Sequence, residues 1–254
     1  VDFRGISIVS NKKEYEDIQR ELTIIHSSIC SNIIKNYSKK IDLIGFHGQT
    51  IIHKPNSGYS IQMGDPNLLS QILKHKVIFN FRKNDILNKG EGAPLSPIYH
   101  FNLYKKLKFR GPYLFLNIGG ISNITFCDKK CFFAKDIGPG NVLIDEFLKK
   151  TKKINFDKNG EIASSGIVDK YIINQFIEHE IYQSKEKHSY DRSEFDFNFV
   201  KGLEFENAVA TLTFFTATII ANYINQTFND KLNIILCGGG RKNIALVKYI
   251  KNLT

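Results

Sequence analysis

Three glycine-rich turns, each placed directly after an apolar, strand-like segment, constrain this sequence more than any other feature. They are Gly119-Gly120, Gly138-Pro139-Gly140 and Gly238-Gly239-Gly240. Such turns bind phosphate because glycine leaves backbone N–H groups accessible and because a following helix N-terminus favours negative charge. A single glycine turn usually satisfies only a tight bend of the chain. Three of them at strand ends favour a phosphate or nucleotide site.

The sequence lacks two common phosphate-binding motifs. Neither G-x-x-x-x-G-K-[ST] nor G-x-G-x-x-G is present, which counts against a Walker-type loop and against a dinucleotide-binding fold. A glycine pair at a hairpin tip and a late glycine triplet favour instead the actin-like arrangement, in which two lobes clamp ATP.

Strand-like and helix-like segments alternate along the chain, which predicts an α/β fold with ligand sites where strands give way to loops. The expected strands are 41–46, 77–81 (buried), 113–118, 121–126, 131–136 and 232–237. The expected helices are 14–36, 141–150, 204–226 and 243–251. We also expect a hairpin partner for the first strand at 50–53 and a helix start at Asp65-Pro66. The first helix carries an apolar stripe of Ile18, Leu22, Ile25, Ile29 and Ile33.

Charge and hydrophobicity exclude several classes of protein. The formal net charge of +10 makes nucleic acid a partner to consider, but such binding normally needs a clustered basic face. The lysines stand in ones and twos, so we expect no nucleic-acid partner. No apolar run approaches the ~20 residues of a membrane-spanning helix, so no membrane partner is expected. The four cysteines lack zinc-type spacing, and we expect reduced thiols in a cytoplasmic protein.

Four side chains near strand ends are candidates for chemistry, and each has a local alternative role. Asp136 is expected to end a strand before a glycine turn, where a rigid carboxylate suits a general base or, equally, caps the turn. His47 and Gln49 follow another strand and either meet a ligand or make hydrogen bonds within the turn. Arg82 follows the strand 77–81 and either holds a carboxylate with its planar fork or forms a surface ion pair.

As a set, the motifs resemble those of the anhydro-N-acetylmuramic acid kinases in order and in spacing. They are His47-Gly48-Gln49-Thr50, Gln62-Met63-Gly64-Asp65, Phe81-Arg82-Lys83-Asn84-Asp85, Gly90-Glu91-Gly92-Ala93-Pro94-Leu95, Asn117-Ile118-Gly119-Gly120-Ile121-Ser122-Asn123, Asp136-Ile137-Gly138-Pro139-Gly140-Asn141, 157–166, 189–195 and 238–243. The match covers nearly the whole chain from Leu43 onward.

The resemblance implies an actin-like ATPase (ribonuclease H-like) fold with mixed sheets, flanking helices and two lobes, at 1–135 and 136–254. It implies a kinase that uses ATP and Mg²⁺, opens the ring of 1,6-anhydro-N-acetylmuramic acid with water and phosphorylates O6 in peptidoglycan recycling. Asp136 would be the general base, and His47, Gln49 and Arg82 would bind the sugar. The nucleotide would contact Gly119, Gly120, Asn123, Gly138, Gly238, Gly239 and Gly240. We expect no metal ligand from the protein itself, and a homodimer is among the assemblies considered.

The sequence departs from the family pattern at three points. The family's N-terminal ATP loop, of the form GTSxDG, is not in this sequence, and neither is the glutamate-bearing segment that follows the glycine triplet. Asn80 and Asp191 stand where the family usually has Asp and Gly. The resemblance therefore describes a fragment lacking parts of both ends. Two other hypotheses stay open: an actin-like kinase for another sugar or carboxylate, and a non-catalytic actin-like module that binds nucleotide or a protein.

Overall fold

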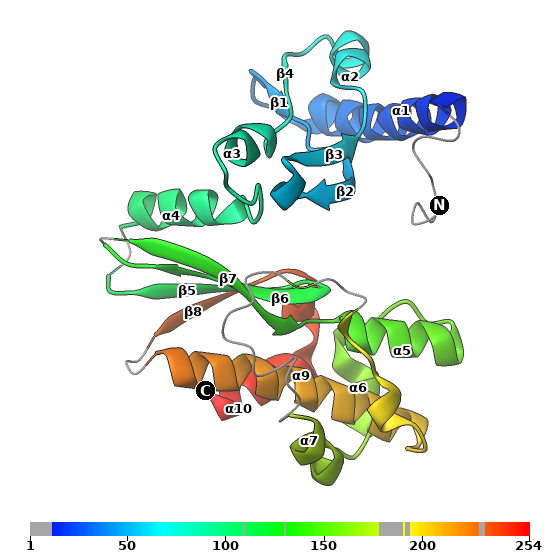
Figure 1. Cartoon of the computed structure of the whole chain (residues 1–254), viewed down its shortest axis with the longest axis vertical. Helices are drawn as coiled ribbons and strands as arrows, with labels where there is room; N and C mark the ends of the chain where they lie inside the picture. Colours follow the sequence, from blue (N-terminus) through cyan, green and yellow to red (C-terminus); the bar gives the residue numbers. More distant parts are fainter. Residues whose placement is uncertain (1–11, 109, 130, 178–189, 191–193, 229–231) are drawn as a thin grey trace. The chain divides into compact units, whose positions relative to one another are not determined.

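The structure is a computed structural model that describes residues 12–108, 110–129, 131–177, 190, 194–228 and 232–254. The chain forms two compact units, unit 1 from Val1 to Leu95 and unit 2 from Ser96 to Thr254. Helices and strands alternate in both units (Figure 1), which confirms the α/β prediction. The division into lobes at 135/136 concerns the complete kinase fold and stays a prediction; strand β7 (Phe132–Pro139) runs through that point.

The described part of unit 1, residues 12–95, contains a long helix, two small sheets and two short helices. Helix α1 (Lys12–Asn36) packs against α2 (Pro66–Leu73). Strand β1 (Ile44–Gly45) pairs in parallel with β4 (Val77–Ile78), and α3 (Lys83–Leu87) follows β4. Strand β2 (Gln49–Lys54) pairs with β3 (Tyr59–Met63) in an antiparallel hairpin, across the turn η2 (Pro55–Ser57).

The predicted helix start at Asp65-Pro66 is confirmed. The Asp65 carboxylate accepts hydrogen bonds from Asn67 N and Leu68 N, at 2.9 and 3.0 Å, and Pro66 occupies the first helical position. These bonds satisfy donors that have no partner within the helix, which is why aspartate favours this position.

Three strand predictions in unit 1 are wrong in detail. The segment 41–46 contributes only the two residues of β1, and its partner is β4, whereas 50–53 belongs to β2 and pairs with β3. The turn at 55–58 explains the second difference, because it joins β2 and β3 within a few residues and so favours their pairing. The segment 77–81 is a strand only at Val77–Ile78, and Ile78 and Phe79 are 48% and 42% exposed rather than buried.

Helix α1 confirms the predicted span, but its apolar stripe does not face the core of unit 1. Ile25, Ile29 and Ile33 are 51%, 56% and 57% exposed, whereas Thr23 and Ser27 are buried. Thr23 faces α2, since its hydroxyl accepts a hydrogen bond from Asp65 N at 2.9 Å. Each helical residue turns the chain by ~100°, so Ile25 lies on the opposite side of α1 from Thr23.

Unit 2 is built on a four-stranded sheet of order β7-β6-β5-β8. Strands β5 (Tyr113–Ile118) and β6 (Ile121–Cys127) form the predicted hairpin, β6 pairs antiparallel with β7, and β8 (Asn233–Cys237) joins β5 in parallel. Strands β5, β7 and β8 therefore run in the same direction, and their carboxyl ends meet at one edge of the sheet. We call this edge the carboxyl edge.

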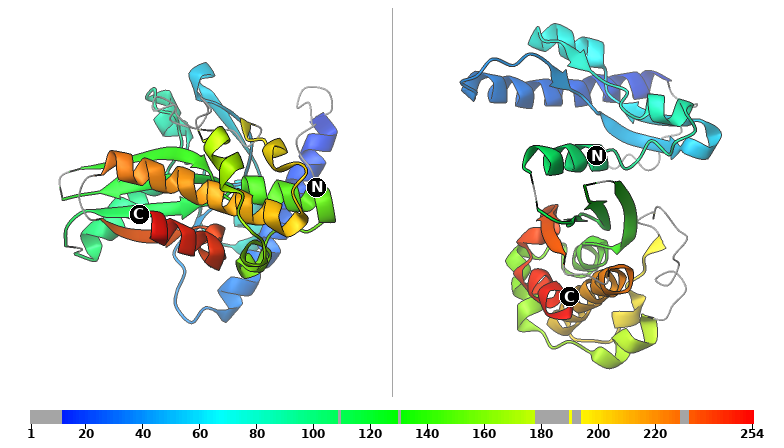
Figure 2. Two further views of the ribbon diagram at one scale, coloured as in Figure 1. Left: turned by 90° about the horizontal axis from the view of Figure 1, so that it is seen from below. Right: turned by 90° about the vertical axis from the view of Figure 1, so that its left-hand side faces the viewer.

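Helices cover both faces of this sheet (Figure 2). On one face, α4 (Ser96–Lys106) packs through Phe101 and Tyr104 against Phe115 and Cys127. On the other face, α9 (Phe205–Thr227) and α10 (Ile244–Leu253) bury the apolar side chains of β5 and β6. The helices predicted at 204–226 and 243–251 are thus confirmed.

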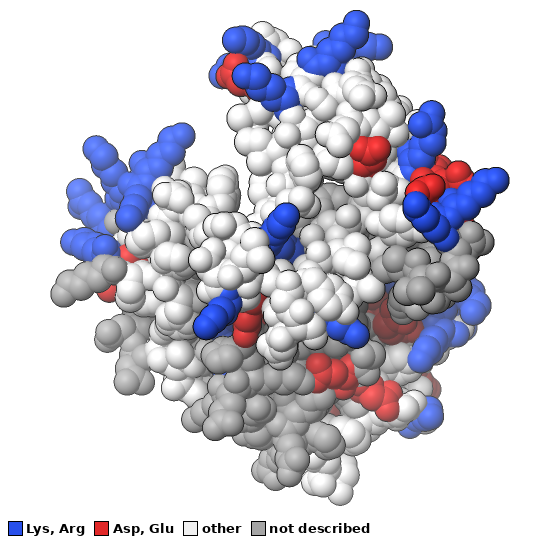
Figure 3. All heavy atoms as spheres, turned by 45° about the horizontal axis from the view of Figure 1, so that its top comes forward, with Lys and Arg blue, Asp and Glu red and all other residues white. Residues whose placement is uncertain are grey.

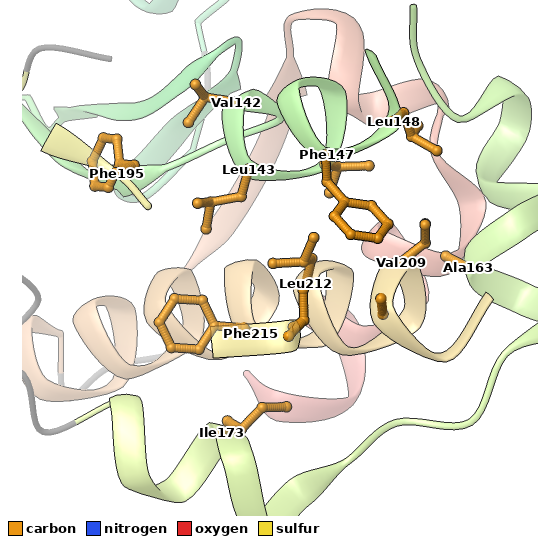
Figure 4. Packing of buried hydrophobic residues seen from close by; sticks show 14 of the residues in the cluster. Val142, Leu143, Phe147, Leu148, Ala163, Ile173, Phe195, Val209, Leu212 and Phe215 are labelled. Atoms are coloured by element: carbon orange, nitrogen blue, oxygen red, sulfur yellow. The ribbon is translucent and has the colours of Figure 1, made fainter. Parts of the chain in front are cut away.

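A second core lies among the helices beyond the sheet. Leu143 and Phe147 of α5 (Val142–Lys152) point toward Leu212 of α9, and Ile173 of α7 (Lys170–Phe176) lies on the other side of α9 (Figure 4). The short α6 (Glu161–Ser165) packs on α9 as well. By length and composition α9 is apolar enough to cross a membrane, but 72% of its apolar window is buried inside the structure, as in a core helix.

Strand β7 extends past the predicted end at Asp136 to Pro139. Its register against β6 shifts there, with Ser122 opposite Gly138 and Asn123 opposite Asp136, so Ile137 is the extra residue of a bulge. Gly138 permits this continuation because its φ of +143° is unfavourable for other residues. Pro139 is tolerated because β7 is an edge strand.

Candidate functional site

The three glycine-rich segments predicted as turns meet at the carboxyl edge of the unit 2 sheet, but Gly138 and Pro139 belong to strand β7 itself and not to a turn. Gly119-Gly120 follows β5, Gly140 follows β7, and the turn η6 (Gly239–Lys242) follows β8. The parallel course of these three strands brings together segments that are far apart in the sequence. Ligands of open α/β sheets bind at such strand ends.

The hairpin tip and the turn after β7 form one hydrogen-bonded unit. Gly140 N and Val142 N donate to the Gly120 carbonyl at 2.9 and 3.1 Å, and Asn141 N donates to the Gly119 carbonyl at 2.7 Å. The Asn141 side chain donates to the same Gly119 carbonyl at 3.0 Å. These bonds hold the N-terminus of α5, with its positive dipole end, at the carboxyl edge.

The glycines at this edge differ in why they are needed. A Cβ atom on Gly238 would lie 2.5 Å from the Ile118 carbonyl oxygen, and one on Gly240 would lie 2.3 Å from Ile118 Cγ2. The fold itself therefore requires glycine at both positions. A Cβ on Gly239 would meet nothing within 4 Å, and one on Gly119 would make only ordinary contacts, with the Ile121 carbonyl oxygen at 3.4 Å and Asn117 Nδ2 at 3.8 Å. Packing of the described residues does not require glycine at Gly119 or Gly239.

A cavity of about 520 Å³ opens beside these turns, a size typical of sites for small molecules. It lies between the first turn of α5, the loop 155–159 and the turn after β8. Its lining residues are Asn141, Ile144, Asp145, Asn155, Phe156, Asp157, Lys158, Asn159, Gly239, Gly240, Lys242 and Asn243. Sequence reasoning assigned only Gly239 and Gly240 to a site. Asn141, 157–159, Lys242 and Asn243 lie within the family motifs but were given no role, and Ile144, Asp145, Asn155 and Phe156 carried no signal.

Asp157 anchors one wall of this cavity. It is 6% exposed, and its carboxylate accepts hydrogen bonds from Ile162 N and Ala163 N, both at 3.0 Å. Gly160 packs so closely on Asn243 that a Cβ would lie 2.2 Å from Asn243 Oδ1. The motif 157–166 therefore has a structural role, because its contacts hold the loop against the start of α10.

Asp136 belongs to a row of polar residues across the sheet. Asn117 of β5 lies opposite Asn123 of β6, which in turn lies opposite Asp136 of β7. Residues directly opposite one another point to the same face of a sheet. Asn117 was not predicted as a site residue, although alternation along β5 places it on the face opposite the buried Leu116 and Ile118.

The Asp136 carboxylate is held by the backbone, since Tyr190 N donates to its Oδ2 at 3.1 Å. Burial is the largest cause of a raised pKa at the Tyr190 phenol, and the charges of Glu194 and Asp136 add to it. The bulge at Ile137 directly follows Asp136, and bulges are over-represented next to active sites.

In unit 1, the structure brings together His47 and Arg82, which are 35 residues apart in sequence. Arg82 Nε donates to His47 Nε2 at 3.1 Å, and Arg82 Nη1 donates to the Gly92 carbonyl at 2.7 Å. Gln49, the first residue of β2, is exposed and donates to the Thr50 carbonyl at 3.4 Å. Burial, followed by the charge of Arg82, lowers the pKa of the nearby His53.

Two substitutions, Asn80 and Asp191, distinguish this chain from the family pattern, and the structure describes only the first of them. Asn80 has a left-handed backbone, with φ +59°, and its carbonyl accepts a hydrogen bond from Lys83 N. Asparagine tolerates this conformation better than most residues. Asp191 lies outside the described residues, as does most of the motif 189–195.

The basic side chains do not form one continuous surface on the face shown in Figure 3, where Lys and Arg stand in separate small groups. The absence of a nucleic-acid partner stays a prediction.

Among the residues that the structure describes, no group of three or more His, Cys, Asp or Glu could hold a metal ion.

Glycine turns, a helix N-terminus and a cavity gathered at the carboxyl ends of strands are typical of α/β proteins that bind phosphate-bearing ligands. The chain belongs to the anhydro-N-acetylmuramic acid kinase family, whose family model matches residues 9–254. Family membership confirms the resemblance carried by the motifs, and with it the actin-like class of α/β fold.

Curated relatives support the same family. The chain is 43% identical over 252 residues to the anhydro-N-acetylmuramic acid kinase of Pelagibacter ubique (strain HTCC1062), covering 95% of this chain and 66% of that protein. It is 36% identical over 233 residues to the enzyme of that name from Zymomonas mobilis, covering 91% of this chain and 63% of that protein. The chain thus spans slightly less than two thirds of the length of these relatives.

Solved structures give more distant likenesses. One is the activator of 2-hydroxyisocaproyl-CoA dehydratase from Clostridium difficile, with bound ADPNP. Its TM-score is 0.43 at 14% identity, and the match covers 83% of this chain and 84% of the activator chain. The ethanolamine utilization protein EutJ from Carboxydothermus hydrogenoformans has a TM-score of 0.46 at 10% identity, covering 92% and 66%. Likenesses this distant say nothing about ligand or activity.

Proposed function

We propose that the complete protein is an ATP-dependent kinase that converts 1,6-anhydro-N-acetylmuramic acid, ATP and water into N-acetylmuramic acid 6-phosphate and ADP. Family membership supports the reaction, and one observation in this chain carries the proposal. The three glycine turns, the N-terminus of α5 and a cavity of nucleotide size all gather at one edge of the sheet.

The nucleotide is proposed to bind at the carboxyl edge of unit 2. Its phosphates would approach Gly119, Gly120 and Gly239, two of which have room beyond their Cα atoms, and would lie near the positive end of α5. Asn123 would lie close by in the polar row of the sheet. The nucleoside would enter the cavity, where Ile144 and Phe156 offer apolar surface and Asn155 offers hydrogen bonds.

Gly138 and Gly240 take a different part in this proposal from the one expected. A Cβ on Gly138 would lie 2.7 Å from Ile219 Cγ2, and a Cβ on Gly240 would lie against Ile118. Both glycines therefore let the chain pack closely behind the site, and their proposed contribution to nucleotide binding is indirect.

Asp136 is the proposed general base. It would take a proton from the water that attacks the anomeric carbon, so that the bond from this carbon to O6 breaks as the new C–O bond forms. The freed O6 would then attack the γ-phosphorus, the bond to the β-phosphate oxygen would break, and ADP would leave. The hydrogen bond from Tyr190 N, which holds the carboxylate in one orientation, supports this role.

Magnesium is proposed to enter with ATP and to neutralise phosphate charge. Mg²⁺ in kinase sites is usually bound by one or two carboxylates, substrate phosphates and water. The lack of a larger ligand cluster among the described residues is compatible with this mode. Asp145 lines the cavity one turn into α5, and we assign it no bond to the metal, in keeping with the expectation of no metal ligand from the protein itself. We propose the cytoplasm, where ATP is available, as the location; a homodimer stays a prediction.

The test uses the complete protein, ATP, the anhydrosugar and oxygen-18 water, with product analysis by mass spectrometry. One solvent oxygen is expected at the anomeric carbon of N-acetylmuramic acid 6-phosphate. A phosphorylated sugar with an intact anhydro ring would contradict the mechanism. Phosphorylation of open sugars alone would identify a different sugar kinase, and nucleotide binding without turnover would identify a binding module.

A further inference from the structure

Arg82 is held from two sides in unit 1, and the geometry of one side determines the state of His47. His47 Nδ1 lies 2.8 Å from the Gly48 carbonyl oxygen, and His47 Nε2 lies 3.1 Å from Arg82 Nε. A carbonyl oxygen only accepts hydrogen bonds, so Nδ1 must carry the proton. A guanidinium only donates, so Nε2 must be unprotonated. His47 is therefore a neutral imidazole with its proton on Nδ1.

The other side is a loop that Asp85 fixes. The Asp85 carboxylate accepts a hydrogen bond from Gly92 N at 2.6 Å, and its carbonyl accepts one from Gly90 N at 2.8 Å. Gly90 lies so close to this carboxylate that a Cβ would be 2.3 Å from Asp85 Oδ2. The loop in turn presents the Gly92 carbonyl to Arg82 Nη1 at 2.7 Å.

Arg82 thus donates to two neutral groups, through Nε to the His47 ring and through Nη1 to the Gly92 carbonyl. Neither partner carries a negative charge that would balance the positive charge of Arg82. A guanidinium has five N–H donors and matches a carboxylate in a two-point contact. The ionisable groups near this cluster are Asp85, which is bound to the loop, and the exposed Glu91 and His53. Because the Arg82 guanidinium is held in place before an anion binds, less conformational entropy is lost on binding.

We propose that His47 is a positioning residue, which acts through Arg82 by orienting its guanidinium toward a carboxylate on the sugar substrate. This rests on the proposed function and changes the role expected for His47, from a substrate contact to a support for the residue that makes the contact. Gly48, with φ +69° and no room for a Cβ beside the Met63 carbonyl, keeps its own carbonyl in place for His47 Nδ1.

A double-mutant cycle on the complete protein tests this role. His47→Phe keeps the ring and removes the acceptor, and we expect KM for the anhydromuramic acid to rise about tenfold with little change in kcat. His47→Gln, which offers an amide oxygen near the position of Nε2, should restore most of the affinity. Arg82→Met should raise KM at least as much, and adding His47→Phe to it should have no further effect.

Two controls make the result specific. The carboxylate of anhydro-N-acetylmuramic acid belongs to its lactyl group, and the control substrate is the same anhydrosugar without that group. With this control substrate, His47→Phe should leave KM unchanged. His75→Phe removes another histidine of unit 1 that has the same kind of Nδ1 contact with a backbone carbonyl, and it should leave KM unchanged for both sugars. If His47→Phe still raised KM in the Arg82→Met background, or raised KM equally for both sugars, His47 would contact the sugar itself. Either result would overturn the proposal.

A readout that needs no substrate separates this proposal from the proposed function. Long-range proton–nitrogen NMR spectra of the imidazoles, assigned with His47→Phe, should report the Nδ1–H tautomer for His47. A proton on Nε2 would overturn the positioning role whatever the substrate is. If the wild-type protein does not act on either sugar while the tautomer is as expected, the proposed function fails and the role toward this substrate fails with it.

Discussion

At the scale of the residue, the role of Asp136 as general base stays a prediction, and its alternative is a structural one. Asp136 lies within β7 just before the bulge and not at the strand end, and its carboxylate accepts a backbone hydrogen bond from Tyr190, 54 residues away. A carboxylate held in this way can be a base or a purely structural acceptor. These roles differ in what they contribute to turnover and to stability.

Replacing Asp136 with Asn separates the two roles. Asparagine keeps the size and an acceptor oxygen but cannot take up a proton at neutral pH. If Asp136 is the base, turnover should fall by the ~10²–10⁴ typical of lost general-base catalysis, with ATP and sugar affinity nearly unchanged. A structural role alone would lower stability by ~1 kcal/mol and leave turnover intact. Steady-state kinetics and a thermal melt of the same preparation decide between them.

The glycines of the carboxyl edge allow a matched pair of substitutions. Gly239→Val places its side chain in open space, so we expect a normal melting temperature and ATP affinity reduced about tenfold or more, ~1.4 kcal/mol, if phosphate approaches there. Gly240→Val meets Ile118 at 2.3 Å and should instead lower the melting temperature. Isothermal titration with ATP gives the affinities. Unchanged ATP binding in a well-folded Gly239→Val protein would remove Gly239 from the proposed site.

At the scale of the element, α4 shows how a helix is attached to the sheet of unit 2 by more than apolar contacts. The His100 ring stacks on Phe115 with a centroid distance of 4.5 Å, and His100 Nδ1 lies 2.9 Å from Thr125 Oγ1. Burial lowers the pKa of His100 below the ordinary value of 6.5. The folded state therefore favours the neutral ring, and the unfolded state binds the proton more readily.

This difference predicts a pH dependence of stability. When the pKa is lower in the folded state, the unfolded state holds more protons, so the contribution is fully present above pH ~6.5 and is lost as pH falls below that value. His100→Phe keeps the stack but cannot titrate, so its melting temperature should fall less than that of wild type between pH 7 and pH 5. Parallel melting curves for the two proteins would contradict this role of His100.

At the scale of the whole molecule, the two units divide the proposed work. All groups assigned to the nucleotide and the base lie in unit 2, and all groups assigned to the sugar carboxylate lie in unit 1. The chain also spans only 63% to 66% of the Zymomonas mobilis and Pelagibacter ubique relatives, so the activity is proposed for the complete protein. For this reason the kinetic tests above are designed for the complete protein.

The sequence by itself determined the features that depend on neighbours within a few residues. The cap at Asp65, the β5–β6 hairpin, the spans of α1 and α9 and the glycine turns all follow from local hydrogen bonding or from periodicity. The motif order was specific enough to identify the family. Only the tertiary structure decided which strands pair, as with β1 and β4, and that α1 meets α2 through Thr23, Cys30 and Ile34 and not through its predicted apolar stripe. It also decided that Arg82 meets His47 and Gly92, and that loop 155–159 closes a cavity beside Gly239. Such contacts join residues tens of positions apart, and their energies depend on packing and desolvation that no local pattern contains.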